Sequence, residues 1–166
     1  MSALSSWGDS YAGEEEEMRK RPDKHRQARD RRDEVVTAAT KAGEAAYAPY
    51  SGFQVGAAVL TATGRIFTGC NVENVSYGLT VCAERVAVWN AVAAGEREVV
   101  AVAVVTDGPL VFPCGACLQV IQEFAGTEPP VIIAANLEGA AEVRSLAECL
   151  PCAFTSFKPD NPEAGE

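Results

Sequence analysis

The chain has 166 residues, of which 48% are hydrophobic, which is enough for one domain with a buried core. No apolar run approaches the length of a membrane span and the N-terminus is too polar for a secretory signal, so we expect a cytoplasmic protein with no membrane partner. The formal net charge of −9 is poorly suited to tracking a phosphate backbone, which favours small substrates and disfavours nucleic acid.

Six cysteines and a single histidine limit the chemistry further. Without a secretory signal, metal ligation explains the cysteines better than a disulfide framework does. The histidine, His25, lies in a charged N-terminal segment where we expect a solvated side chain. A Ser-His-Asp or Cys-His centre is therefore excluded from the folded part, and a metal there must be held by sulfur or carboxylate.

Residues 1–28 lack hydrophobic periodicity. Their four consecutive glutamates, Glu14–Glu17, are followed by the basic run Arg19–Arg21. This composition predicts a charged extension that is disordered or partly helical. We place the folded domain at residues 29–157 and a frayed tail at residues 158–166.

The first half of the domain is expected to begin with a helix over residues 30–47, where apolar side chains recur at helical spacing. Strands over residues 53–60 and 65–70 follow, joined by the turn Thr61–Gly64. The polar loop over residues 71–81 ends at a candidate metal ligand, so we expect it to contact substrate.

The second half alternates helices and strands. Helices are expected over residues 82–94 and from 114 or 115 to 124, with buried strands at 99–106 and 131–135. A short edge strand at 142–144 and a helix capped by Ser145 complete the pattern. This order predicts an α/β fold, a three-layer α/β/α sandwich with a mixed, roughly five-stranded sheet.

The most informative motif combines Cys82-Ala83-Glu84 with Pro113-Cys114-Gly115-Ala116-Cys117. A catalytic zinc typically takes three protein ligands and keeps a fourth position open, so Cys82, Cys114 and Cys117 are the expected ligands of one Zn²⁺ per chain. Glu84 is better placed to reach a water than the metal. The arrangement matches a described signature of zinc-dependent deaminases.

Other interpretations of the cysteines stay open. A lone Cys-x-x-Cys also occurs in structural zinc knuckles and redox pairs. Cys149 and Cys152 form a second such pair, which in principle could join Cys114 and Cys117 in a four-cysteine structural site. That site would leave the Cys82-Ala83-Glu84 motif without a role, so we favour the three-cysteine centre.

From about residue 35 to residue 154 the chain resembles the homotetrameric cytidine deaminases. The resemblance is carried by Tyr50-Ser51-x-Phe53-x-Val55-Gly56-Ala57-Ala58, Gly69-Cys70-Asn71-Val72-Glu73-Asn74, Cys82-Ala83-Glu84-Arg85 and Pro113-Cys114-Gly115-Ala116-Cys117-x-Gln119. It implies zinc-dependent hydrolysis of cytidine or 2'-deoxycytidine to the uracil nucleoside and ammonia, a reaction of pyrimidine salvage. It also implies a homotetramer whose active sites are shared between subunits.

Carried over position by position, the resemblance assigns Glu84 as the catalytic proton carrier. Arg85 is similar to an arginine that donates hydrogen bonds to the ligand thiolates and reduces their charge. The backbone N–H of Ala83 would hold the oxygen of the base, and Phe53 would pack on the base.

The remaining substrate contacts are implied by the same resemblance. Asn71 and Glu73 resemble ribose-hydroxyl ligands, which favours a free nucleoside, and the charge of Glu73 would repel a phosphate. Phe154 is similar to a C-terminal aromatic that reaches into another subunit's site, and Tyr77 is a second contact. Plainer interpretations are a core residue for Phe53, a turn residue for Asn71, a solvated carboxylate for Glu73 and a C-terminal staple for Phe154.

Leu118 departs from the family pattern, which has arginine after the last ligand. We expect activity to survive this change with an altered pH profile or substrate preference. One alternative function is therefore deamination of a modified cytosine nucleoside, of the blasticidin type or substituted at N4 or C5. Another is a non-catalytic zinc-binding protein, although such a protein has no reason to keep Glu84, Asn71 and Glu73 together.

Overall fold

The computed structural model describes residues 24–156, so the expected tail at 158–166 and most of the expected extension lie outside the described residues. The elements in chain order are α2 (Lys24–Asp30), α3 (Arg32–Gly43), β1 (Val55–Thr61), β2 (Ile66–Cys70), the 3-10 helix η1 (Tyr77–Leu79), α4 (Ala83–Ala93), β3 (Val99–Thr106), α5 (Gly115–Glu123), β4 (Val131–Asn136), β5 (Ala141–Ser145) and α6 (Leu146–Cys149).

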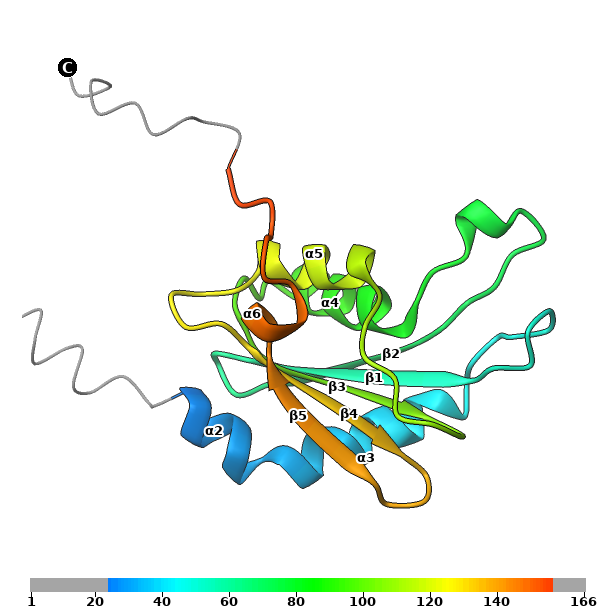
Figure 1. Ribbon diagram of the computed structural model, residues 1–166, viewed down its shortest axis with the longest axis horizontal. Helices are drawn as coiled ribbons and strands as arrows, with labels where there is room; N and C mark the ends of the chain where they lie inside the picture. Colours follow the sequence, from blue (N-terminus) through cyan, green and yellow to red (C-terminus); the bar gives the residue numbers. More distant parts are fainter. Residues whose placement is uncertain (1–23, 157–166) are drawn as a thin grey trace, which may run out of the picture.

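A single five-stranded sheet forms the middle layer, in the order β2-β1-β3-β4-β5. Only β3 and β4 run parallel, because α5 carries the chain between them, and the other three neighbouring pairs are antiparallel. α2 and α3 lie on one face, and α4, α5 and α6 lie on the other (Figure 1). The expected three-layer α/β/α sandwich with a mixed sheet is confirmed.

The apolar runs of the sequence become the buried strands. Every residue of β1 and β3 is buried, as expected for strands covered on both faces, whereas the edge strand β5 is mostly exposed. Alternate side chains of β3 divide between two core clusters. Val102 and Val104 pack with the helices α4 and α5, and Ala101 and Ala103 pack with the residues on the α3 side.

Two glycines bring the helices close to the β1–β2 hairpin. A Cβ at Gly56 would collide with backbone atoms of Ala39 and Gly43 in α3, and a Cβ at Gly69 would collide with backbone atoms of Ala83 and Ala87 in α4. Only glycine permits this separation without a shift of the backbone. The close approach of α4 matters because its first turn carries the candidate metal ligand and carboxylate.

The folded part begins earlier than the expected boundary between residues 28 and 29, which cuts through α2. Ala28 is 2% exposed and packs in the same cluster as Ile133 and Val131. A seven-residue helix with few apolar positions gives no detectable period in the sequence, so only tertiary burial reveals it. None of the helices within residues 24–156 is long and apolar enough to span a membrane.

Candidate active site and metal centre

The three predicted ligands come together at the N-termini of two helices. Cys82 and Cys114 are the N-cap residues of α4 and α5, and Cys117 is a fully buried residue in the first turn of α5. The Sγ atoms lie 4.0 Å apart for Cys82 and Cys114 and 3.6 Å apart for Cys114 and Cys117, and all three lie within 4.8 Å of one another. Two sulfurs bound tetrahedrally to zinc at about 2.3 Å are about 3.8 Å apart, so the donor set fits zinc.

The N-termini of α4 and α5 also favour the negative charge of cysteine thiolates. Both N-cap cysteines have extended backbone conformations, and neither side chain caps its own helix, so the sulfurs remain available to a metal. The unpaired N–H groups of the two first turns carry partial positive charge. This charge offsets part of the negative charge that three thiolates would bring to one ion.

Without a bound cation, the three thiols strongly affect one another's pKa values. Hydrogen bonding to Cys117, with smaller contributions from Arg85 and Cys114, lowers the pKa of the Cys82 thiol to about 5. The same contact with Cys82, and then burial, raises the pKa of Cys117. One thiolate therefore holds back ionisation of its neighbour, and a divalent cation would remove that conflict.

Arg85 reaches the cluster from the first turn of α4. Its Nη2 donates to the backbone oxygen of Thr80 at 3.3 Å and lies 3.8 Å from Sγ of Cys82. The Trp89 ring lies below the guanidinium, with its centroid 6.0 Å from Cζ. Arg85 therefore lies beside a candidate ligand thiolate, and its role as a donor to that thiolate stays a prediction.

Glu84 lies beside the thiols and is only 4% exposed. Burial raises the pKa of its carboxyl, and the nearby charge of Cys82 adds to this effect. A carboxyl with a raised pKa next to a metal centre can both accept and donate a proton near neutral pH. Its oxygens do not belong to the three-sulfur group, so it is available to act on a substrate or a water.

A cavity of about 320 Å³ opens onto this centre. Its size is that of a small-molecule site. The lining contains Cys82, Cys114, Glu84, Ala83, Phe53, Asn71 and Glu73 of the predicted set, together with Ser51, Val55, Thr80, Val81, Val104, Val111 and Phe112. The structure thus brings seven of the predicted site residues to one cavity.

Asn71 and Glu73 both have partners within the chain. The Asn71 amide accepts the N–H of Val55 at 2.9 Å and donates to the carbonyl of Phe53 at 2.8 Å, so it holds the start of β1. The Glu73 carboxylate accepts the Ser51 hydroxyl and the backbone N–H of Tyr50, which lower its pKa and keep it ionised. Glu73 is therefore a fixed anion at the rim.

Tyr77 and Phe154 do not line the cavity of this chain. Tyr77 is 76% exposed and packs edge-on against Tyr50, with ring centroids 6.0 Å apart. Phe154 is 56% exposed, and its backbone exchanges two hydrogen bonds with the side chain of Gln119 on α5. Their predicted roles as substrate contacts remain predictions.

Val111 and Phe112 form part of the cavity lining that was not predicted from the sequence. Both precede Pro113 in the connection from β3 to α5, and the guanidinium of Arg144 lies 4.6 Å from the centroid of the Phe112 ring. An aromatic residue next to a metal-ligand motif is a usable signal. The contact with Arg144 on the edge strand could not be read from the sequence, because 32 positions separate the two residues.

The second cysteine pair does not join the centre. Among residues 24–156, the only group of three or more His, Cys, Asp or Glu side chains close enough to hold a metal is Cys82, Cys114 and Cys117. The four-cysteine alternative with Cys149 and Cys152 is therefore not supported.

Leu118 is 5% exposed and belongs to the core cluster on the α4 and α5 side.

The fold and the site define a zinc-type hydrolytic centre, with three thiol ligands and a buried carboxyl in an α/β/α domain. Residues 29–134 match the model of the cytidine and deoxycytidylate deaminase zinc-binding region. The chain belongs to this family.

Individual relatives agree with this assignment. A cytidine deaminase of Sporosarcina psychrophila is 49% identical over 125 residues, which cover 74% of this chain and 90% of that protein. A cytidine deaminase of Halalkalibacterium halodurans is 48% identical over 123 residues, covering 74% and 92%. The crystal structure of cytidine deaminase from Burkholderia pseudomallei superposes with a TM-score of 0.69 at 47% identity, covering 74% of this chain and 98% of that one.

Proposed function

We propose that the chain catalyses hydrolytic deamination of cytidine or 2'-deoxycytidine to the uracil nucleoside and ammonia. The observation that carries this is the position of Glu84, buried against a three-cysteine centre at the end of a cavity of nucleoside size. A non-catalytic zinc protein would not need this carboxyl, whose burial is unfavourable for the ionised form.

The residues present suggest how the reaction proceeds. A zinc ion held by Cys82, Cys114 and Cys117 would supply Lewis acidity. Glu84 takes one proton from the attacking water and delivers it to N3 of the base. It then takes the second proton from the oxygen now bonded to C4 and delivers it to the amine, which leaves as ammonia. Its raised pKa suits a group that must hold the proton between these steps.

Neighbouring groups would position the nucleoside. Ala83 is the first residue of α4, so its N–H has no acceptor within the helix and is available to the oxygen of the base. Phe53, 38% exposed at the cavity, offers a face for the base, and Asn71 and Glu73 are placed for the sugar. The fixed negative charge of Glu73 favours a nucleoside over a nucleotide.

We also propose a cytoplasmic homotetramer in which neighbouring subunits complete each site. The support is the family resemblance, together with aromatic side chains left exposed on the chain described here, Tyr77, Trp89 and Phe154 among them. We retain the proposed division into extension, zinc domain and tail, with the domain beginning at α2. Light scattering on the zinc-loaded protein should give a mass of about four chains, and a monomer would contradict the assembly.

The direct test follows the absorbance change from cytidine to uridine with zinc-loaded protein. We expect turnover of cytidine and of 2'-deoxycytidine, with ammonia released in equal amount. N4- and C5-substituted cytosine nucleosides are assayed in parallel. Turnover of these alone would favour the alternative function, and no turnover of any of them by folded, zinc-replete protein would refute the proposal.

Leu118 gives a separate prediction. Leu118→Arg introduces a charge into the core, so we expect a lower melting temperature together with a changed pH–rate profile or substrate preference. Leu118→Met, which conserves volume, is the control and should leave all three unchanged. An unaltered pH–rate profile and preference in the arginine variant would refute the expectation.

A further inference from the structure

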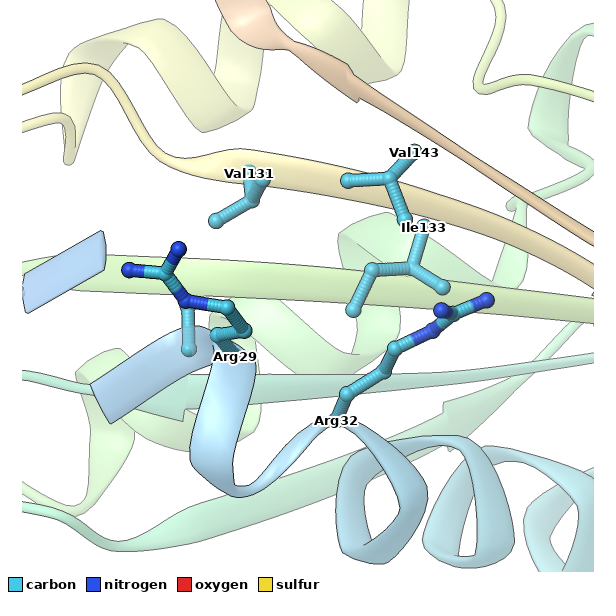
Figure 2. Close-up of a pocket in the computed structure, with 6 residues that line it drawn as sticks. Arg29, Arg32, Val131, Ile133 and Val143 are labelled. Carbon is cyan, nitrogen blue, oxygen red and sulfur yellow. The ribbon is translucent and has the colours of Figure 1, made fainter. Parts of the chain in front are cut away.

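A second cavity lies on the face of the sheet that carries α2 and α3, opposite α4 and α5. It measures about 360 Å³, and we call it the α2 cavity. Figure 2 shows the side chains of Arg29 and Arg32 flanking it from the helices, with three apolar side chains of the sheet facing them. The lining consists of Ala28, Arg29, Arg32, Val131, Ile133 and Val143.

The cavity exists because the helical cover of this face is incomplete. α3 packs on β1, β2 and β3, and α2 packs on β3. At the outer side of this cover, the side chain of Val143 on β5 remains 43% exposed. An apolar floor of this kind is usually covered by another part of the protein or by a partner.

The two arginines at the α2 cavity indicate which kind of group binds there. Arg29 and Arg32 take part in none of the ion pairs found among residues 24–156. Each guanidinium offers several N–H donors in a planar fork that fits a carboxylate. The site therefore suits an acidic segment with apolar neighbours, in a chain whose net charge is −9.

We propose that the segment preceding Lys24 covers the α2 cavity, with the carboxylates of Glu14–Glu17 binding Arg29 and Arg32. Residues 1–23 contain six acidic and three basic side chains, so the segment has the complementary charge. Its larger apolar residues, suited to the floor of the cavity, include Leu4, Trp7, Tyr11 and Met18, and it also has two alanines.

A docked N-terminal segment would extend the packing that α2 already makes on this face of the sheet. The family match begins at residue 29, so most of α2 precedes it, and yet Ala28 is buried against the sheet beside Ile133. The chain before the matched region thus already packs on this face.

The chain between the acidic run and α2 is long enough for the glutamates to reach Arg29 and Arg32. Lys24 lies seven positions after Glu17, and an extended chain over seven positions spans about 23–25 Å. The distance along α2 from Lys24 to Arg29 is only about 7.5 Å. Because the segment is tethered, its effective concentration at the cavity reaches the millimolar range, which favours it over a free carboxylate ligand.

The test measures trypsin cleavage after Arg19 and Lys20 in the full-length, zinc-loaded protein, with fragments identified by mass. The double variant Arg29→Gln/Arg32→Gln should be cleaved about tenfold faster, because cleavage follows the undocked population. Arg29→Lys/Arg32→Lys, which keeps the charge, should restore most of the protection and thus exclude simple fraying of α2. Lys41→Gln, an exposed charge loss on α3, is the matched control and should match the wild type.

The same comparison is repeated with Glu14–Glu17 all replaced by Gln. In that background the arginine substitutions should change the cleavage rate by less than about twofold, since their partners are gone. An equal acceleration in both backgrounds, or none in the first, would overturn the proposal. Protection that falls on dilution would assign the cavity to a second copy of the chain and would therefore also overturn the proposal.

Discussion

Replacing Glu84 with Gln should reduce kcat for cytidine by at least about 10²–10⁴-fold while one zinc per chain is retained. Two carboxyls among the described residues line the cavity. Glu84 lies beside the thiols, whereas Glu73 is held by Ser51 and the backbone of Tyr50. The amide has nearly the same shape and cannot carry the proton, and general acid–base catalysis typically contributes factors of this size. The measurement is steady-state deamination with zinc analysis of the same sample.

The same variant should not be less stable than the wild type when metal-free. Burial raises the pKa of Glu84 above its unfolded value. Such a group stabilises the fold below the unfolded pKa, and this contribution is lost as pH rises through the folded pKa. Gln does not ionise, so the metal-free variant should melt at the same or a higher temperature at neutral pH.

For the activity prediction, a Glu84→Gln variant with retained zinc and near wild-type turnover would remove Glu84 from the mechanism.

Replacing Cys117 with Ser should weaken zinc binding by more than about 100-fold and abolish deamination. Cys117 is fully buried in the first turn of α5, so no solvent-exposed group can take its place, and loss of a ligand exceeds the 10–100-fold effect typical of outer-shell changes. The measurement is the zinc dissociation constant from competition with a chromophoric chelator.

Cys152→Ser is the matched control for that substitution. Cys152 is exposed and does not belong to the metal-binding group, so its variant should bind one zinc per chain as the wild type does. If Cys117→Ser kept its zinc while Cys152→Ser lost it, the metal would be held by a different set of cysteines.

The sequence by itself determined the metal centre and most of the fold. Two helix starts, each carrying cysteines at ligand spacing, limit the geometry so strongly that Cys82, Cys114 and Cys117 could be assigned before any coordinates. The strand at residues 99–106 was predicted with its observed bounds, because a continuous run of β-branched residues and alanine is typical of a strand covered on both faces.

Only the tertiary structure decided which residues far apart in the chain share a surface. The stacking of Arg144 on Phe112, the burial of Ala28 of α2 against the sheet and the α2 cavity all depend on contacts between elements. The use of the Asn71 amide to hold β1 is equally invisible to the sequence pattern. Local spacing determines which side chains leave one helix or strand together, whereas packing of layers decides what they meet.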